Sequence, residues 1–177
     1  MARDGTRRGG ARPGAGRPRK SLDEKLRDGD KADVMMVPEE LEGADIPPVR
    51  EFITQEQKDG TKLCSEEVYN ETYEWLKKWK CDAIVSRQLV EQYAMTIGRW
   101  IHCEKIISSR GYLSKHPTTG QAIASPYVKM SQDYMKQANT LWNEIFQIVR
   151  ENSTGDFETS SPQASVMEMI LTARTGG

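Results

Sequence analysis

The chain has 177 residues, of which 29% are charged and 37% hydrophobic, and its net charge is −1. This length fits one domain with tails, and so polar a composition excludes a large core unless a second subunit completes it. No apolar run reaches the ~20 residues of a membrane span, and the N-terminus lacks the apolar segment of a secretory signal. Three cysteines without CxxC spacing predict reduced, cytosolic thiols.

The first 20 residues form a basic arm that is dense in glycine and proline. Such a segment buries too little surface to offset its ordering entropy, so we expect it to be disordered when free. It carries a net charge of +6, which leaves −7 on the rest of the chain. That asymmetry predicts an arm that binds DNA phosphates, although a solvated tail without a partner is the alternative. The predicted contacts are Arg3, Arg7, Arg8, Arg12, Arg17, Arg19 and Lys20.

A connector follows the arm. Ser21 can cap a short helix that ends at Gly29, although a charged linker is the alternative. The Pro47–Pro48 pair excludes a long helix before Val49. We expect a short helix over 50–58 and, otherwise, an extended connector lying across the body of the protein.

A helix is predicted to begin at Ser65, with Glu66 and Glu67 in its first turn, where carboxylates suit the positive end of the helix dipole. Its apolar face includes tryptophans and tyrosines. Lysines crowd the last turn, where they either complement the negative end of the dipole or form a patch that faces DNA. The candidate DNA contacts at this end of the helix are Lys77, Lys78, Lys80 and, just beyond, Arg87.

The segment from Val85 to Ser109 is free of proline and has one internal glycine, Gly98. Its apolar residues recur at helical spacing and predict a long core helix with a broad apolar face. These residues are Leu89, Val90, Tyr93, Ala94, Ile97, Trp100, Ile101 and Ile107. Together with the preceding helix it predicts a plain antiparallel hairpin. The alternative is a helix-turn-helix that reads DNA, but the second helix is too apolar to lie comfortably in a groove.

A turn and a third helix follow. Gly111 is expected to end the central helix, and the PTTG sequence predicts a turn between two short strands over 112–115 and 121–124. Ser125 followed by Pro126 is a strong start signal for a helix that fades at Asn152. Because the link is short, this helix should pack antiparallel to the central one.

The C-terminal segment contains a polar linker and a short apolar stretch. An amphipathic helix after a flexible linker is typical of a docking peptide, although it could instead fold back on the body. The predicted docking residues are Val166, Met167, Met169, Ile170 and Leu171.

Catalytic and cofactor motifs are not evident. His102 and His116 are the only histidines. His102 is adjacent to Cys103 on one helix, so the two side chains face different ways. A zinc site from Cys64, Cys81 and Cys103 would lack paired-ligand spacing, and no phosphate-binding GxxxxGK[ST] loop is present. We therefore predict no enzyme activity, no metal and no cofactor.

Several segments resemble phage terminase small subunits of the type common in prophages of Gram-positive bacteria. They are GARPGAGRPRK, QLVEQYAMTIGRWIHCEK, GYLSKHPTTGQAIASPYVKMSQDYMKQANTLWNEIFQIVREN and VMEMILTAR. The resemblance covers roughly residues 60–174 and the basic arm, and SKHPTTGQAIASPY is its most specific part.

The resemblance implies a non-catalytic subunit that binds the packaging site on double-stranded phage DNA in the cytoplasm of the bacterial host. It also implies a homo-oligomeric ring, a helical fold with an antiparallel hairpin at its heart, and recruitment and regulation of the large ATPase-nuclease subunit. A phage transcriptional regulator with a helix-turn-helix is the alternative function.

The predicted architecture is mainly α-helical: an antiparallel helical hairpin core, a short β-hairpin and a ring-forming oligomer. We divide the chain into an arm and linker over 1–33, a connector over 34–62, a helical core over 63–152, and a linker with a docking helix over 153–177. Neighbouring subunits are expected to cover the apolar surface that one chain leaves exposed.

Overall fold

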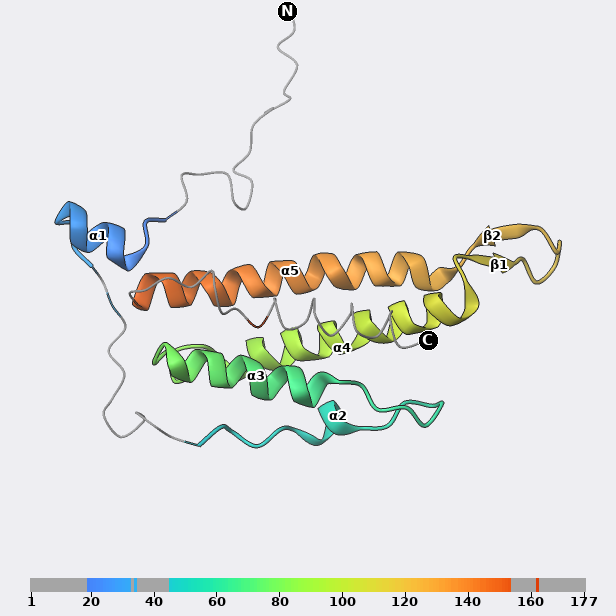
Figure 1. The fold of residues 1–177 in the computed structure, drawn as a ribbon, viewed down its shortest axis with the longest axis horizontal. Helices are drawn as coiled ribbons and strands as arrows, with labels where there is room; N and C mark the ends of the chain where they lie inside the picture. Colours follow the sequence, from blue (N-terminus) through green and yellow to red (C-terminus); the bar gives the residue numbers. More distant parts are fainter. Residues whose placement is uncertain (1–18, 33, 35–44, 154–161, 163–177) are drawn as a thin grey trace, which may run out of the picture.

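The computed structural model describes residues 19–32, 34, 45–153 and 162. In this part of the chain, three long helices lie side by side and a two-stranded ribbon projects from one end (Figure 1). The elements in chain order are α1 (Leu22–Asp28), α2 (Glu51–Thr54), α3 (Ser65–Lys78), α4 (Arg87–Arg110), β1 (Leu113–Lys115), β2 (Ala122–Ala124) and α5 (Pro126–Asn152). No described helix is both long enough and apolar enough to cross a membrane.

The central helix α4 is packed between the other two long helices. Both α3 and α5 run antiparallel to α4, so α3 and α5 are parallel to each other (Figure 1). The predicted antiparallel hairpin and its coverage by the third helix are therefore confirmed. The wide apolar face of α4 is covered largely by α3 and α5 of its own chain.

Three aromatic side chains join the three long helices. The ring of Trp142 on α5 lies 5.1 Å from Trp75 on α3 and 5.5 Å from Tyr93 on α4, measured between centroids. Phe146 extends the cluster, 6.5 Å from Trp75. Such pairs contribute about 0.5–1.5 kcal/mol each beyond the burial of their surface. Aromatic residues from three separate helices thus meet at one point of the core.

The short helix α1 is capped as its sequence predicts. Ser21 Oγ accepts a hydrogen bond from the backbone N–H of Glu24, and the Glu24 carboxylate accepts one from Ser21 N–H. Gly29 ends the helix in the left-handed conformation, with φ of 70°. This reciprocal capping box satisfies two donors that a helix end leaves free, and Leu22 is buried.

The helix predicted over 50–58 is wrong in length, because α2 ends at Thr54. Gln55 takes an extended conformation, and the backbone N–H of Gln57 then donates to the carbonyl of Thr61. A turn closed at Gly60, whose φ is 77°, replaces the remaining helical turn.

The ribbon and α5 follow the sequence closely. Leu113 pairs with Ala124 and Lys115 with Ala122, in antiparallel register. Pro126 is the first residue of α5 and Asn152 its last, as predicted. Ser125 and Ser86 stand at the N-cap positions of α5 and α4, but neither side chain makes a capping hydrogen bond.

The first half of α5 is more exposed than its second half. Met130 is 42% exposed and Met135 is 39% exposed, whereas Ile145 and Val149 in the second half are fully buried. The ribbon is also exposed on every residue of both strands. The core therefore lies toward the end of the bundle away from the ribbon.

Candidate functional site

The described part of the basic arm is anchored by ion pairs. Arg19 Nη1 lies 3.2 Å from the carboxylate of Glu151 near the end of α5. Lys20 Nζ lies 2.7 Å from both Asp28 and Asp30, whose hydrogen bonds raise the pKa of the Lys20 ammonium. We call Arg19 and Lys20 the arm's root. Arg19 joins it to α5, whereas Lys20 pairs with residues at the end of α1. The other five predicted contacts, Arg3, Arg7, Arg8, Arg12 and Arg17, lie outside the described residues.

Three lysines follow the C-terminal end of α3, and we call Lys77, Lys78 and Lys80 the lysine tip. Lys78 and Lys80 are exposed and Lys77 is half-buried. Lys78 Nζ lies 5.7 Å from the centroid of the Trp79 ring. Lys80 takes a positive φ of 55°, which ends the helix and turns the chain toward α4. Because these lysines lie at the C-terminal end of a helix, the negative end of the helix dipole stabilises their charge.

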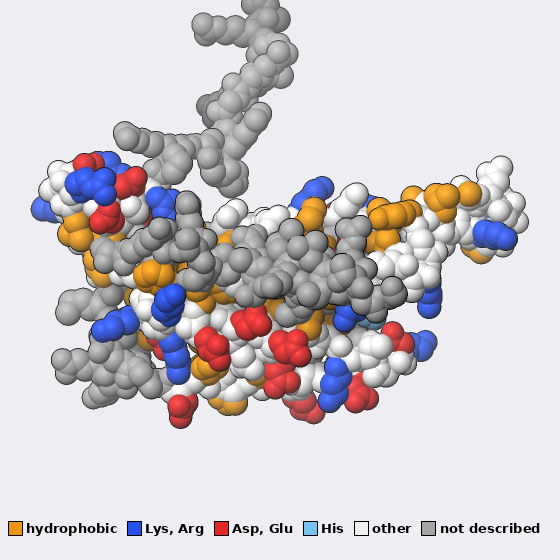
Figure 2. Space-filling model, viewed as in Figure 1, with side chains coloured by type: hydrophobic (Ala, Val, Ile, Leu, Met, Phe, Trp, Pro, Cys, Tyr) orange, Lys and Arg blue, Asp and Glu red, His pale blue; other side chains and the backbone are white. Residues whose placement is uncertain are grey.

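The lysine tip and the arm's root lie at the same end of the bundle (Figure 1). Parallel α3 and α5 both finish there, and α1 is held at the end of α5 by Arg19–Glu151 and by Arg150–Glu24, at 3.9 Å. Figure 2 shows Lys and Arg side chains at this end of the molecule. The fold thereby brings the arm's root and the lysine tip, two groups of predicted DNA contacts about 60 positions apart in the chain, to the same end of the molecule.

Arg87, predicted as a further DNA contact, is committed to internal contacts. Its Nε lies 2.9 Å from Glu91 Oε1, and its Nη2 donates to the carbonyl of Pro48. Glu91 is 2% exposed, and its other oxygen lies 3.1 Å from Arg50 Nη1. A buried carboxylate needs such partners because desolvation penalises its charge.

The buried Glu91 was missed by the sequence reasoning. It binds Arg50 of the connector and Arg87 of α4, while Tyr69 Oη on α3 donates to the carbonyl of Pro47 at 3.1 Å. These contacts fix the connector to the hairpin. The one available signal was the i, i+4 spacing of Arg87 and Glu91 on the helix, which favours an ion pair.

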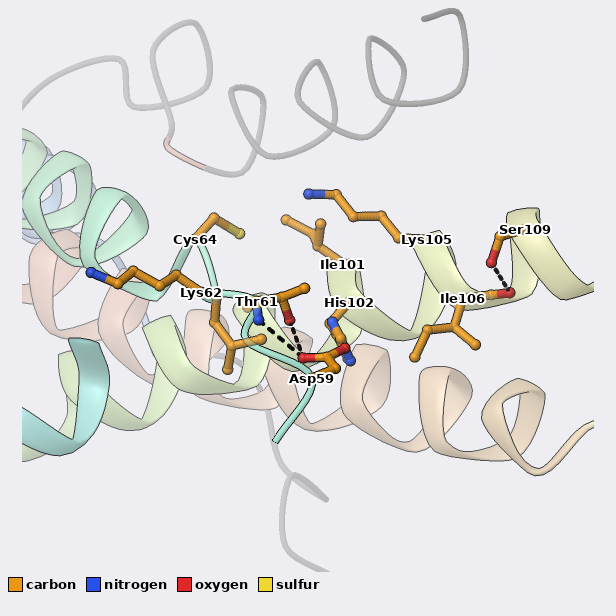
Figure 3. Close-up of a pocket in the computed structure, with 11 residues that line it drawn as sticks. Asp59, Thr61, Lys62, Cys64, Ile101, His102, Lys105, Ile106 and Ser109 are labelled. Carbon is orange, nitrogen blue, oxygen red and sulfur yellow. Dashed lines mark hydrogen bonds between the residues drawn. The ribbon is translucent and has the colours of Figure 1, made fainter. Parts of the chain in front are cut away.

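A pocket of about 220 Å³ lies between the loop before α3 and the C-terminal half of α4 (Figure 3). Asp59 is beside His102 in this pocket and accepts hydrogen bonds from the N–H and the hydroxyl of Thr61, at 3.1 and 2.7 Å. The hydroxyl bond is the main reason that the pKa of Asp59 is lowered. Burial raises the pKa of the Cys64 thiol, although Lys105 opposes it. A thiol with a raised pKa is a weak nucleophile at neutral pH.

The three cysteines do not come together. Cys64 precedes α3 and Cys81 follows it, so the 14 residues of that helix separate them by about 20 Å. All three thiols are free. Within the described ranges, no three His, Cys, Asp or Glu side chains form a group that could hold a metal ion.

Comparison with protein families found a match. Residues 66–146, which run from the start of α3 into the second half of α5, match the family described as phage terminase, small subunit. Over these residues the chain is similar to phage terminase small subunits. The resemblance seen in the sequence is confirmed over the three long helices. No curated protein and no solved structure gives a significant match to the chain.

In terminases the small subunit is typically the non-catalytic one. The matched region contains the ribbon and the lysine tip, whereas the basic arm and the apolar C-terminal stretch lie outside it. The five predicted docking residues, Val166, Met167, Met169, Ile170 and Leu171, also lie outside the described residues.

The fold argues against the helix-turn-helix alternative, because the helix that would have to contact DNA is packed in the core. The second helix of such a motif must lie in the DNA groove. Here that helix is α4, which packs against both α3 and α5. Val90, Ala94 and Ile97 on it are buried. In this structure α4 is therefore the centre of the helical core rather than a recognition helix.

Proposed function

We propose that this chain is the small subunit of a viral DNA-packaging terminase. It binds the packaging site on double-stranded phage DNA in the bacterial cytoplasm, and it recruits and regulates the large subunit that carries the ATPase and nuclease. It performs no catalysis itself and needs no metal or cofactor. The match of residues 66–146 to the small-subunit family is the observation that carries this proposal.

The DNA contact is proposed at the end of the bundle where the arm's root and the lysine tip lie. Arg3, Arg7, Arg8, Arg12 and Arg17 extend the arm beyond Arg19. Cations spaced through a Gly-Pro segment suit phosphate binding by counterion release, which supplies affinity rather than sequence choice. Lys78 and Lys80 are exposed at the same end. Arg87 contributes indirectly, because it fixes the connector that follows the arm.

Two protein partners complete the proposal. The chain forms a homo-oligomeric ring, and the segment around 166–171 docks on the large subunit. The support for docking is the apolar stretch Val166–Leu171, which follows a polar linker and has the pattern of peptides that lay one apolar face in a groove.

Fluorescence anisotropy with duplex DNA that contains the packaging site tests the DNA contact over a range of salt. Deleting residues 1–20 should weaken binding and flatten the salt dependence, by about 0.9 in the log–log slope for each phosphate that the arm neutralises in the full-length protein. Changing Lys77, Lys78 and Lys80 to Ala should weaken binding less.

The matched control replaces three exposed lysines away from this end, Lys58, Lys129 and Lys136, with Ala. It should retain wild-type affinity. An arm deletion that leaves both affinity and salt slope unchanged would show that the arm is not the DNA-binding element.

A further inference from the structure

The ribbon has no packing partner in the described part of its own chain. Its strands have three residues each, and a lone two-stranded hairpin is marginally stable in water. Large apolar side chains are nevertheless exposed on it, with Tyr112 and Leu113 at 68% and Ile123 at 37%. Met130 and Met135 in the first half of α5 are also exposed. Such a surface is typical of an interface.

The charge around the ribbon is of one sign. Residues 105–132 contain no Asp or Glu and carry Lys105, Arg110, Lys115 and Lys129. Lys129 lies 3.4 Å from Asp133, whereas Arg110 and Lys115 are exposed. His116 holds the turn, since its Nδ1 accepts the backbone N–H groups of Thr118 and Thr119. The ribbon therefore has an ordered turn, and the exposed cations Arg110 and Lys115 lie near its exposed apolar side chains.

The same chain carries the complementary charge on α3. Glu67, Glu71 and Glu74 are at helical positions i, i+4 and i+7 and share one face, which we call the acidic stripe. None of the three forms an ion pair with another described residue. Like charges at this spacing repel one another, and Figure 2 shows carboxylates gathered over α3.

Glu71 is the residue of the acidic stripe whose charged form is disfavoured by its surroundings. One of its carboxylate oxygens, Oε2, is buried and has no hydrogen-bond partner among the described residues. Burial raises the pKa of Glu71, and Glu67 and Glu74 raise it further. A cation that another molecule places against the exposed Glu67 and Glu74 would offset their repulsion of Glu71.

We propose that the ribbon of one subunit docks on the acidic stripe of the next, so that Arg110 and Lys115 face Glu67 and Glu74 of the neighbouring copy. The partner is a second copy of this chain, because both complementary surfaces occur on one molecule and the apolar side chains need a protein surface rather than phosphates to cover them. The two surfaces differ, so the contact is head-to-tail, which closes into a ring if the rotation permits. The inference rests on the oligomer in the proposed function and names its interface.

Charge exchange tests the contact. The ribbon variant carries Arg110→Glu and Lys115→Glu, the stripe variant carries Glu67→Lys and Glu74→Lys, and a third variant carries all four changes. A control variant, Lys31→Glu with Lys58→Glu, changes the net charge as much as the ribbon variant does, at exposed positions outside both surfaces. The full-length proteins are compared by light scattering, and circular dichroism checks that each has folded.

The ribbon and stripe variants should each raise the concentration for half-assembly at least about tenfold, because like charges then face each other. The four-change variant should regain assembly, as should an equimolar mixture of the ribbon and stripe variants, and the control should assemble as wild type. A folded ribbon variant with wild-type mass would overturn the proposal. If it then lost DNA affinity or co-purification with the large subunit, the ribbon would belong to that partner. Failure of all charge exchanges to restore assembly would also overturn it.

A wild-type protein with the mass of one subunit would defeat the oligomer of the proposed function itself. An oligomer whose mass is the same in the variants as in the wild type would contradict only the proposed interface. The two failures are therefore distinguishable.

Discussion

The hydroxyl of Ser65 lies directly against the Cα of Gly98. A Cβ at residue 98 would overlap Ser65 Oγ and would also lie 3.3 Å from the Cβ atoms of both Leu63 and Ser65. The start of α3 therefore crosses α4 as closely as the absence of a side chain permits. A glycine in the interior of α4 lowers the stability of the helix. Its presence at residue 98 is explained by the close crossing of α3 and α4, which leaves no room for a side chain.

Gly98→Ala should destabilise the folded protein by about 1–3 kcal/mol, even though alanine is the better helix former, because the added methyl overpacks the crossing. Urea unfolding followed by circular dichroism measures the change. Unchanged or increased stability would mean that α3 can shift away from α4 without loss.

Ser65→Ala provides the matched control. Ser65 Oγ is buried without a hydrogen-bond partner among the described residues, and such a group contributes no net stabilisation. The single substitution should therefore leave stability unchanged or raise it slightly. Combined with Gly98→Ala, it should recover part of the loss, and an additive loss in the double variant would contradict this explanation.

Glu91→Ala should cost about 1–3 kcal/mol, because it removes the charged hydrogen-bond acceptor that Arg50 and Arg87 share. Arg50→Ala should cost only about 0–1 kcal/mol, since the Arg50 side chain is 53% exposed. Urea midpoints of the two variants give the comparison. Equal losses would show that Glu91 is not the centre of this ion-pair cluster.

The sequence predicted the elements better than it predicted their environments. Ser125–Pro126 and Asn152 mark the ends of α5 because local start and stop signals act within a few residues. Glu91 was missed because its burial depends on Arg50 of a distant connector. Met130 fits the apolar stripe of α5, yet it is exposed, because it is the neighbouring Ser131 that faces α4 and hydrogen-bonds Glu104. The lysine tip was predicted, but its position beside the arm's root follows from the three-helix topology.

Trp142→Ala should destabilise the protein by about 3–5 kcal/mol, because Trp142 joins α3 and α4 through Trp75 and Tyr93. Trp142→Phe keeps an aromatic ring at this point and should cost clearly less. Urea unfolding and near-ultraviolet circular dichroism check both variants. A loss below about 1 kcal/mol for the alanine variant would mean that the three helices are held together elsewhere.

Cys64 should react slowly with iodoacetamide at pH 7.5, and the rate should rise steeply as the pH passes 9. Burial raises the thiol pKa above its ordinary 9.0, so the reactive thiolate forms only in alkaline solution. Peptide mass spectrometry follows each cysteine separately, and Cys81, whose pKa burial raises to about 11, should react more slowly still. Rapid modification of Cys64 at neutral pH would indicate an activated thiol and would reopen a catalytic function.

Deletion of residues 164–177 should abolish co-purification with the large subunit, because it removes Val166, Met167, Met169, Ile170 and Leu171. The mass of the oligomer should not change, since the proposed interface between copies uses α3 and the ribbon. Substituting Asp for Ile170 alone should weaken the complex in the same direction. Retained co-purification after the deletion would assign recruitment to another surface.

The solution mass of the purified full-length protein, measured by light scattering, tests the central claim most directly. One subunit weighs 20.1 kDa, and a DNA-packaging ring requires a discrete mass of many subunits. That result would agree with the exposed ribbon and the acidic stripe as surfaces covered by neighbours. A mass of one or two subunits at all concentrations would contradict the ring.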